Sequence, residues 1–288
     1  MNWSAKPSFR QQLLIGIKVK HIMNFTSTDD SSIRVHPSAI VDPKAELDAG
    51  VTVGPYSIIE ANVRIGKNCR VGAHAHVASG ARIGADCQIF TGAVIGSIPQ
   101  DLKFEGEETT LEIGERTTIR EFATLNRGTK DHWKTIVGSD CLLMAYSHVA
   151  HDCSIGSHCI LANAVNLAGH VVIEEWASIG GMTAVHQFNR IGQHCFVGGG
   201  CRVVKDVPPY ILAMGEPLTF GGLNSVGLSR RGFSEETMMT LKRVYKSLYK
   251  SRLNVSQAVE RIRKECELTP EVQNVLAFIE KSERGIIG

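Results

Sequence analysis

The chain has 288 residues, 43% of them hydrophobic and 21% charged, and its formal net charge is +2. This length and composition suit a globular protein with an ample core, and no stretch approaches the roughly 18 apolar residues that a membrane span needs. Basic and acidic residues nearly balance, at 31 and 29. Because the basic residues are not interleaved with aromatic ones, we expect no nucleic-acid binding. Because no apolar stretch is long enough, we expect no integral membrane segment.

Residues 1–32 precede the first repeat and are expected to form a loose arm. Residues 1–28 hold four basic residues and no acidic one, a composition that is also typical of a transit peptide. The apolar run at 13–17 is too short for a secretory signal, and translation from Met23 or an unstructured extension would explain the segment as well. We therefore favour a cytoplasmic protein.

Residues 33–207 carry an aliphatic side chain at every sixth position. Between Val35 and Val203, 26 of the 29 positions in this register are Ile, Leu or Val, which no random chain would give. A six-residue unit cannot bury its apolar side chain alone, whereas stacked units bury a continuous column of them. The period therefore predicts a parallel β-helix made of hexapeptide repeats.

Small residues stand two positions before most of these aliphatic residues, where the alternation of a strand also points the side chain inward. Seven of the eight cysteines occupy this position, and only Cys266 lies outside it. None of the short cysteine spacings of metal sites is present, and a free cysteine packs as a small hydrophobic residue. We therefore interpret the seven as core residues rather than as metal ligands, disulfides or nucleophiles.

Two polar segments, 97–110 and 128–135, interrupt the repeat without changing its phase. They contain the three positions of the register that are not aliphatic, Asp101, Glu107 and Asp131. Loops that leave a rigid scaffold frequently carry function, so both insertions are candidate parts of a binding site.

The double proline after residue 207 is expected to end the repeat, and residues 208–288 are predicted to form a C-terminal helical domain. Ser234 and the two glutamates after it mark a helix start with an N-cap and an acidic first turn, and this helix should run to about Lys250. A second helix is expected after Ser256. A third should start at Thr269, because the proline that follows suits the first helical position.

Hexapeptide chains resemble the left-handed parallel β-helix family, in which three hexads form one triangular coil. Residues three hexads apart would then stack about 4.8 Å apart, as adjacent strands do. Two such columns gather polar residues, which are His151, Gly169 and Gln187 in the first and Asp152, His170 and Phe188 in the second. His148 and His186 lie close to them in sequence.

These residues suit acyl transfer to a hydroxyl group. A histidine such as His151 can remove the proton of the attacking hydroxyl, and Asp152 can orient the ring or stabilise the imidazolium. Gly169 has no side chain in the column, which leaves its N–H free for a developing oxyanion. The simpler alternative is exposed corner residues stacked by chance, and we adopt it for four other histidines, which are His74, His76, His158 and His194.

Several motifs resemble the UDP-N-acetylglucosamine O-acyltransferase family, which catalyses the first step of lipid A biosynthesis. The resemblance runs from about residue 35 to residue 288, and the motifs together are far more specific than the repeat alone. They lie at residues 100–103, 148–153, 167–170, 180–188, 206–210 and 230–233.

The resemblance implies transfer of an (R)-3-hydroxyacyl chain from acyl carrier protein, whose thioester is the co-substrate, to the 3-hydroxyl of UDP-N-acetylglucosamine. It also implies a homotrimer with active sites between neighbouring β-helices, and neither a metal nor a further cofactor. His151 would be the general base, Asp152 its partner and the Gly169 amide the oxyanion donor. The substrate-binding residues would be Asp101, Lys103, His148, His170, His186, Gln187, Gly199, Asn224, Arg230 and Arg231.

The same resemblance assigns parts of the substrates to some of these residues. Asp101 and Lys103 would bind the sugar and the phosphate end of the donor's arm, and His148, His170 and Gln187 the sugar or diphosphate. Asn224 and Arg230, with Arg231 nearby, would hold the nucleotide diphosphate, and Gly199 would leave room for a longer acyl chain. One departure concerns Val226, where the family pattern has glutamate. It leaves the acceptor less defined than the reaction, and a 3-amino sugar analogue is not excluded.

Other functions stay open at this point. The sister N-acyltransferase of the pathway would carry an additional N-terminal domain, for which residues 1–32 are too few. A coenzyme A-dependent acetyltransferase and a non-catalytic scaffold are further alternatives, and a γ-class carbonic anhydrase would need three histidines on one zinc ion. A basic face on the first predicted helix could bind the acidic carrier protein or could simply be solvated, and its residues are Lys242, Arg243, Lys246 and Lys250.

Overall fold

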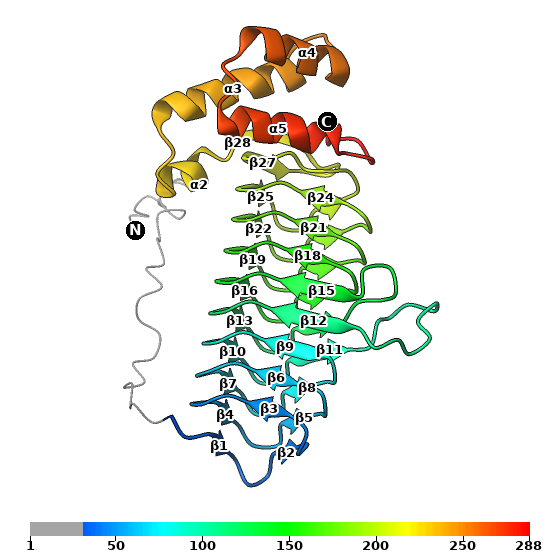
Figure 1. Ribbon diagram of the computed structural model, residues 1–288. Helices are drawn as coiled ribbons and strands as arrows, with labels where there is room; N and C mark the ends of the chain where they lie inside the picture. Colours follow the sequence, from blue (N-terminus) through cyan, green and yellow to red (C-terminus); the bar gives the residue numbers. More distant parts are fainter. Residues whose placement is uncertain (1–30) are drawn as a thin grey trace, which may run out of the picture. The chain divides into compact units, whose positions relative to one another are not determined.

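The computed structural model describes residues 31–288, and the expectations for a loose N-terminal arm and for a start at Met23 fall on residues outside this range. The described part begins with 26 short strands that wind through three parallel sheets, coil upon coil (Figure 1). The first sheet contains β1 (Arg34–Val35), β4 (Thr52–Val53), β7 (Arg70–Val71), β10 (Gln88–Ile89), β13 (Thr118–Ile119), β16 (Leu142–Leu143), β19 (Ile160–Leu161), β22 (Ser178–Ile179) and β25 (Phe196–Val197).

The second and third sheets supply the other two sides of each coil. The second sheet contains β2 (Ile40–Val41), β5 (Ile58–Ile59), β8 (His76–Val77), β11 (Val94–Ser97), β14 (Thr124–Asn126), β17 (His148–Val149), β20 (Asn166–Leu167), β23 (Ala184–Val185) and β26 (Arg202–Val203). The third contains β3 (Glu46–Leu47), β6 (Arg64–Ile65), β9 (Ala81–Ile83), β12 (Thr110–Ile113), β15 (Lys134–Val137), β18 (Ser154–Ile155), β21 (Val172–Ile173) and β24 (Arg190–Ile191).

The strand register confirms a coil of three hexads, since Val35 pairs with Val53 and Val53 with Val71. Across the two insertions the paired residues lie further apart in sequence, because Ile95 pairs with Leu125 and Leu125 with Val149. The insertions therefore lengthen two coils and leave the aliphatic column continuous.

The core of the β-helix is this aliphatic column. Every Ile, Leu and Val of the register from Val53 to Val203 is buried, as the period predicted. Val35, at the start of the column, is 43% exposed because β1 is the end strand of its sheet. Burial of a column that spans the whole repeat is the main source of stability of such a fold.

The seven cysteines of the repeat are all buried and Cys266 is half-buried, which confirms that the seven are core residues. Six of them do more than fill apolar space, because their thiols contact backbone carbonyl groups of the following coil, whereas the Cys201 thiol contacts the Gly199 carbonyl of its own turn. The Cys69 thiol donates to the Gly84 carbonyl at 3.0 Å and the Cys153 thiol to the Ala168 carbonyl at 3.2 Å. Ser57 donates in the same way, to the Gly72 carbonyl at 2.6 Å.

Three edges separate the sheets, and the turns along each edge stack on one another. We call them the 1–2, 2–3 and 3–1 corners after the sheets that they join. The turns recur with one residue in the left-handed region, and at the 2–3 corner Asp152, His170 and Phe188 have φ values of 58°, 61° and 66°. Both insertions leave the β-helix at the 2–3 corner, between β11 and β12 and between β14 and β15.

The C-terminal part adds a β-hairpin and four helices. The hairpin strands are β27 (Ile211–Met214), which pairs in parallel with β25, and β28 (Thr219–Leu223), which is antiparallel to β27. The first sheet therefore continues past the double proline by these two strands, and the end of the hexapeptide repeat at residue 207 stays a prediction. The helices are α2 (Ser225–Arg230), α3 (Glu235–Tyr249), α4 (Val255–Glu265) and α5 (Pro270–Glu280).

Two of the three predicted helix starts are confirmed, with Ser234 as the N-cap of α3 and Thr269 as the N-cap of α5. The start predicted after Ser256 is wrong, because Asn254 and Gln257 form a capping box that begins α4 earlier. Residues 31–288 form one compact unit, so a domain boundary at residue 208 stays a prediction. None of the described helices is long and apolar enough to cross a membrane.

Candidate active site

The 2–3 corner brings together the two polar columns predicted from the sequence. The His170 N–H donates to the His151 carbonyl at 3.1 Å, and the Phe188 N–H to the Gly169 carbonyl at 3.3 Å. The turns of successive coils thus stack directly, and His151, Asp152 and His170 form one buried cluster.

His151 and Asp152 form a hydrogen-bonded pair at this corner. His151 Nδ1 lies 2.8 Å from Asp152 Oδ2, and the two residues are 9% and 2% exposed. Thr129, from the second insertion, donates to the same carboxylate through its backbone N–H at 2.9 Å and its hydroxyl at 2.7 Å. The Asp152 N–H donates to the Thr135 hydroxyl at 2.8 Å. The carboxylate is therefore fixed in position, and it orients the imidazole with Nε2 directed away from it.

The electrostatics favour an ionised Asp152. Burial opposes ionisation of this carboxyl group, but the hydrogen bonds from His151 and Thr129 outweigh burial and lower its pKa to about 2. The hydrogen bond to Asp152 in turn raises the pKa of His151 against the effect of burial, and the charges of Asp101 and Asp131 act in the same direction. The pair is thus built to stabilise a proton on His151 once it has been taken up.

His170 closes the cluster from the next coil. Its Nε2 lies 3.7 Å from Asp131 Oδ2 and 3.8 Å from Asp152 Oδ2, and its ring meets that of His151 edge to face at 5.2 Å. Phe188 stacks on its other side, with ring centroids 4.5 Å apart. Burial lowers the pKa of His170, so it favours the neutral form more than an ordinary histidine does.

His148 lies on strand β17, just before the turn that holds His151. Its Nδ1 lies 2.7 Å from the Thr124 hydroxyl on the neighbouring coil. Burial lowers the pKa of His148, and the charge of His151 acts in the same direction. The half-buried ring keeps Nε2 available for a ligand at the corner.

Gly169 stacks directly on His151. A Cβ atom at Gly169 would lie 2.6 Å from His151 Cε1 and 2.7 Å from Nε2, so no side chain fits in this position. The Gly169 N–H donates to no other residue within 31–288. Gly169 therefore combines a close approach to the His151 ring with a backbone donor that has no partner among residues 31–288.

The first insertion places Asp101 near enough to His151 for its charge to affect that ring. The Lys103 N–H donates to Asp101 Oδ1 at 3.0 Å, which holds the loop in a turn with the Lys103 side chain exposed. Leu102 between them is fully exposed. This segment thus offers one acidic and one basic group at the rim of the histidine cluster.

Gln187 and His186 occupy the corner one coil beyond Gly169, half-buried and exposed respectively. Gly199 lies elsewhere, between β25 and β26 at the 1–2 corner, and it is exposed. In one protomer the structure therefore brings His186 and Gln187 to the cluster but not Gly199.

The remaining predicted residues lie near the 3–1 corner. The Asn224 amide caps α2, accepting from the Gly227 N–H at 3.2 Å, and donates to the His194 carbonyl at 2.9 Å. The Arg231 guanidinium lies 5.1 Å from the Trp176 ring centroid, while Arg230 is exposed at the end of α2. Within one protomer these three residues are not brought to the cluster.

Of the four histidines expected to be exposed corner residues, only His74 is exposed, and the expectation is wrong for the half-buried His76, His158 and His194. His194 lies among rings, with Tyr210 stacked at 5.7 Å and Phe233 edge-on at 4.9 Å. Burial, with a contribution from the Arg231 charge, lowers its pKa to about 4. A spacing rule could not show this, because Phe233 comes from the helical region.

His151, Asp152 and His170 place one potential metal-binding atom each within 4.8 Å of one another. Asp152 Oδ2 already accepts from His151 Nδ1 and from the Thr129 hydroxyl, and Oδ1 accepts from the Thr129 N–H. These bonds occupy the carboxylate with protein donors. The donor set therefore fits a histidine–carboxylate pair better than a zinc centre, which needs free ligand atoms.

Three further functional candidates are Thr129 and His132, which were not found from the sequence, and Asp131, which the sequence showed only as a break in the aliphatic register. All lie on the second insertion, and the His132 ring meets that of His170 edge to face at 5.2 Å. The insertion breaks the spacing rule, so its residues have no predictable place in the columns. The only signal was that an interruption at this corner leaves the phase intact.

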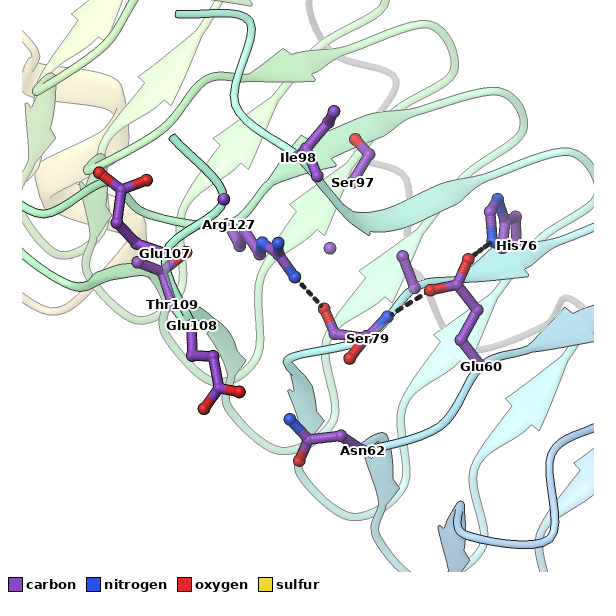
Figure 2. A pocket seen from close by; sticks show the side chains of 13 residues that line it. Glu60, Asn62, His76, Ser79, Ser97, Ile98, Glu107, Glu108, Thr109 and Arg127 are labelled. Atoms are coloured by element: carbon purple, nitrogen blue, oxygen red, sulfur yellow. Dashed lines mark hydrogen bonds and ion pairs between the residues drawn. The ribbon is translucent and has the colours of Figure 1, made fainter. Parts of the chain in front are cut away.

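A separate cavity of about 480 Å³ lies beside the first insertion and does not contain the histidine cluster (Figure 2). Glu60 in its wall pairs with His76 at 2.8 Å and accepts from the Ser79 N–H at 2.9 Å. Arg127 donates to the Ser79 carbonyl at 2.9 Å. Arg127 Nε and Glu107 Oε1 in the same wall have no hydrogen-bond partner among the described residues. None of the lining residues belongs to the histidine cluster, so the cavity is separate from the candidate active site.

Comparison with known proteins points to one family. A model described as UDP N-acetylglucosamine O-acyltransferase, domain 2, matches residues 206–287, and the bacterial transferase hexapeptide model matches residues 62–97 and 134–169. The chain is 49% identical over 258 residues to an acyl-[acyl-carrier-protein]–UDP-N-acetylglucosamine O-acyltransferase of Janthinobacterium sp. (strain Marseille), covering 88% of this chain and 98% of the relative. The corresponding protein of Myxococcus xanthus is 48% identical over 254 residues, with the same coverage.

Solved structures agree with the sequence comparison. A UDP-N-acetylglucosamine acyltransferase from Bacteroides fragilis is similar to this chain with a TM-score of 0.87 and 45% identity, over 88% of this chain and 99% of the other. The structure from Acinetobacter baumannii gives a TM-score of 0.86 and 42% identity, with the same coverage. Together with the hexapeptide repeats, these structures confirm the predicted fold, a left-handed parallel β-helix followed by a small helical region.

Proposed function

We propose a specific reaction for this chain, which belongs to the acyl-[acyl-carrier-protein]–UDP-N-acetylglucosamine O-acyltransferase family and is an acyltransferase. The reaction is transfer of an (R)-3-hydroxyacyl chain from the thioester of acyl carrier protein to the 3-hydroxyl of UDP-N-acetylglucosamine, as the first step of lipid A biosynthesis. The thioester is a co-substrate, and no metal or further cofactor is needed. The observation that carries the proposal is the His151–Asp152 pair with the Gly169 N–H beside it.

His151 is the general base of this mechanism. Its Nδ1 is bound to Asp152, so Nε2 takes the proton of the sugar hydroxyl as the oxygen attacks the thioester carbonyl carbon. The Asp152 carboxylate stabilises the imidazolium that forms. Collapse of the tetrahedral intermediate breaks the carbon–sulfur bond, and the leaving thiolate takes the proton back from His151.

Gly169 stabilises the intermediate. Gly169 packs against the His151 ring and its N–H donates to no other described residue, which suits a donor for the oxyanion. Because the acyl group passes directly to the acceptor, the mechanism uses no serine or cysteine nucleophile. The buried thiols of the β-helix, which include Cys153, take no part.

The substrate-binding roles follow the position of each side chain. His148, His170 and Gln187 would hold the sugar next to His151, with His186 at the rim. Asp101 would accept from a sugar hydroxyl, and the exposed Lys103 would meet the phosphate end of the donor's arm. These assignments are supported by the proximity of the insertion to His151.

The active form would be a homotrimer. Arg230, Arg231 and Asn224 lie near the 3–1 corner, Gly199 at the 1–2 corner and the histidines at the 2–3 corner. One protomer therefore does not assemble the whole predicted site, whereas a neighbouring copy can supply the missing groups. Arg231 suits a diphosphate, since its guanidinium is half-buried and makes no ion pair with any residue of 31–288.

A cytoplasmic location is consistent with the thiols. All eight cysteines are free, and a reducing compartment keeps thiols in this state. The acyl carrier protein would be met there as the donor.

Mass spectrometry tests the reaction most directly. The purified protein is incubated with UDP-N-acetylglucosamine and a panel of 3-hydroxyacyl carrier proteins, and the expected product gains one hydroxyacyl group as an ester. Coenzyme A thioesters and a 3-amino acceptor serve as competing substrates. Stoichiometric zinc in the active protein, or equal use of coenzyme A thioesters, would contradict the proposal.

Subunit complementation tests the trimer. His151→Ala and Arg231→Ala variants, each of low activity alone, are mixed, unfolded and refolded together. Recovery of activity in the mixture is expected, because mixed trimers contain some sites with both residues intact. A monomeric mass in light scattering would contradict the trimer without contradicting the chemistry.

A further inference from the structure

The C-terminal tail carries an arginine to the corner that holds the histidine cluster. Asp206, in the turn after β26, pairs in parallel with Ile286. The Asp206 N–H donates to the Gly285 carbonyl at 3.0 Å, and the Ile287 N–H to the Asp206 carbonyl at 2.9 Å. The tail is thus fixed as a further layer on the 2–3 corner, although all four helices separate it in sequence from the turn that it covers.

Arg284 of this tail lies over Phe188. The centre of its guanidinium is 5.6 Å from the Phe188 ring centroid, and the same ring stacks on His170 at 4.5 Å. His170 in turn lies 5.2 Å from the ring of His151. Three consecutive contacts therefore connect the guanidinium to the general base, and an arginine held on an aromatic face is oriented in advance.

Lys205 adds a second cation at the same place. It precedes Asp206, and it follows Gln187 by one coil in the column that begins at His151. The Lys205 side chain is exposed, and it belongs to the turn whose Asp206 N–H donates to the carbonyl of Gly285, the residue after Arg284. Lys205 and Arg284 thus each precede a residue of the backbone pairing between Asp206 and Gly285, at the C-terminal end of the polar column.

Neither cation is neutralised by a residue that the structure describes. Within residues 31–288 neither Arg284 nor Lys205 makes an ion pair, and the guanidinium contacts the Phe188 ring. The nearby Asp206 carboxylate is buried, where it accepts from the Arg190 N–H at 2.8 Å and the Ser282 hydroxyl at 2.6 Å. It is therefore occupied, and the two positive charges face outward.

We propose that Arg284 and Lys205 form a phosphate-binding subsite of the active site, an inference that rests on the proposed acyl transfer. Arginine binds phosphate oxygens in pairs through its planar fork. The two residues lie two to three coils from His151, which is roughly 10–15 Å at the spacing of adjacent strands. Both proposed substrates carry phosphate at some distance from the reacting atoms, the nucleotide sugar as a diphosphate and the carrier protein as the phosphodiester of its acyl arm.

Steady-state kinetics with each substrate varied in turn tests the subsite. Arg284→Ala is expected to raise the KM of one substrate about tenfold with kcat within about twofold, and the double variant with Lys205→Ala to raise it further. An effect on the KM of UDP-N-acetylglucosamine assigns the diphosphate, and an effect on the KM of the acyl carrier protein assigns the phosphodiester. Lys281→Ala, which removes a nearby exposed cation, is the matched control and should change neither KM.

Two further measurements separate binding from packing. Arg284→Lys should restore part of the lost affinity, and raising the salt concentration should increase the wild-type KM more than that of the double variant, because salt screens exposed charges. Unchanged KM values in the double variant would overturn the subsite. The subsite would also be overturned if Arg284→Ala raised KM, Arg284→Lys did not lower it again and salt had no effect. That result would show that Arg284 only supports the Phe188 ring.

Direct binding keeps this inference separate from the proposed reaction. If the wild-type protein transfers no acyl group, the proposed function fails, and calorimetric titration with UDP-N-acetylglucosamine and with holo-acyl carrier protein then decides the subsite. Weaker binding of either probe by the double variant, with a Tm equal to that of the wild type, supports it. Equal affinities for both probes would overturn it.

Discussion

Gly169 lies so close to His151 that a single added carbon would overlap the imidazole, at 2.6 Å from Cε1 and 2.7 Å from Nε2. The contact joins the proposed oxyanion donor to the proposed base. It also makes the position sensitive to the smallest possible substitution.

Gly169→Ala should therefore abolish most of the acyl transfer while the β-helix still folds. The methyl group displaces the His151 ring from its place beside the Gly169 N–H, so we expect kcat to fall at least about a hundredfold. Initial rates and circular dichroism measure the two effects. Gly198→Ala is the control, because its Cβ would come no closer than 3.3 Å to a neighbour, and activity equal to wild type in Gly169→Ala would contradict the assignment.

Asp152→Asn should both slow the reaction and move its pH dependence. The hydrogen bond that His151 donates to Asp152 is the main cause of the raised pKa of His151, and the proposed mechanism requires this histidine in its neutral form. In the wild type, the pH at which kcat/KM falls to half on the acidic side should accordingly lie above the ordinary histidine pKa of about 6.5. In the variant this midpoint should shift to lower pH. We expect kcat to fall at least about a hundredfold because the imidazolium loses its partner. A midpoint that stays in place would show that another group controls it.

Thr129 should contribute to stability at neutral pH through Asp152. The pKa of Asp152 is depressed to about 2 in the folded protein, so its contribution is fully present above the unfolded-state pKa of about 4 and is lost as the pH falls towards 2. Thr129→Val removes the hydroxyl donor, and we expect it to reduce the free energy of unfolding by about 1 kcal/mol at pH 7. Denaturation at a series of pH values should show the difference disappearing near pH 2, and a constant difference would contradict the linkage.

The native protein should expose about one thiol per chain to a water-soluble thiol reagent. Seven cysteines are buried, and Cys266 alone is half-buried. All eight should react after unfolding, since none forms a disulfide. Cys266→Ser should reduce the native count to about zero, and rapid reaction of a second thiol would show that the β-helix opens.

The period of the repeat predicts a parallel β-helix, and the family resemblance adds the coil of three hexads. With that coil length the strict repeat determines which residues stack, so His151, Gly169 and Gln187 can be placed in one column. The period does not extend into the insertions or the tail, which is why Thr129 and Arg284 were not found. Asn224 is predicted to bind a nucleotide, but its amide caps α2 and bonds to the His194 carbonyl, a local use that spacing does not reveal.

The helical region is less predictable, for a local reason. Ser234 and Thr269 are strong N-caps that predict α3 and α5, whereas the capping box that begins α4 is less obvious beside Ser256. The six-residue helix α2 has no acidic residue in its first turn, so the sequence gives no signal for its start. The hairpin strand β28 contains two glycines, which are unfavourable in a strand. Short elements that depend on tertiary pairing give weak signals in sequence.

Both insertions leave and re-enter the β-helix at a single corner, where the coils before and after them determine the two attachment points. Their length and chemistry can therefore change while the aliphatic column beneath them stays as it is. Such loops can be exchanged without changing the β-helix that carries them. Grafting the 98–109 loop of one family member onto another should transfer preferences for acceptor or donor without an equal loss of stability, so the selectivity of this enzyme can be altered separately from its scaffold.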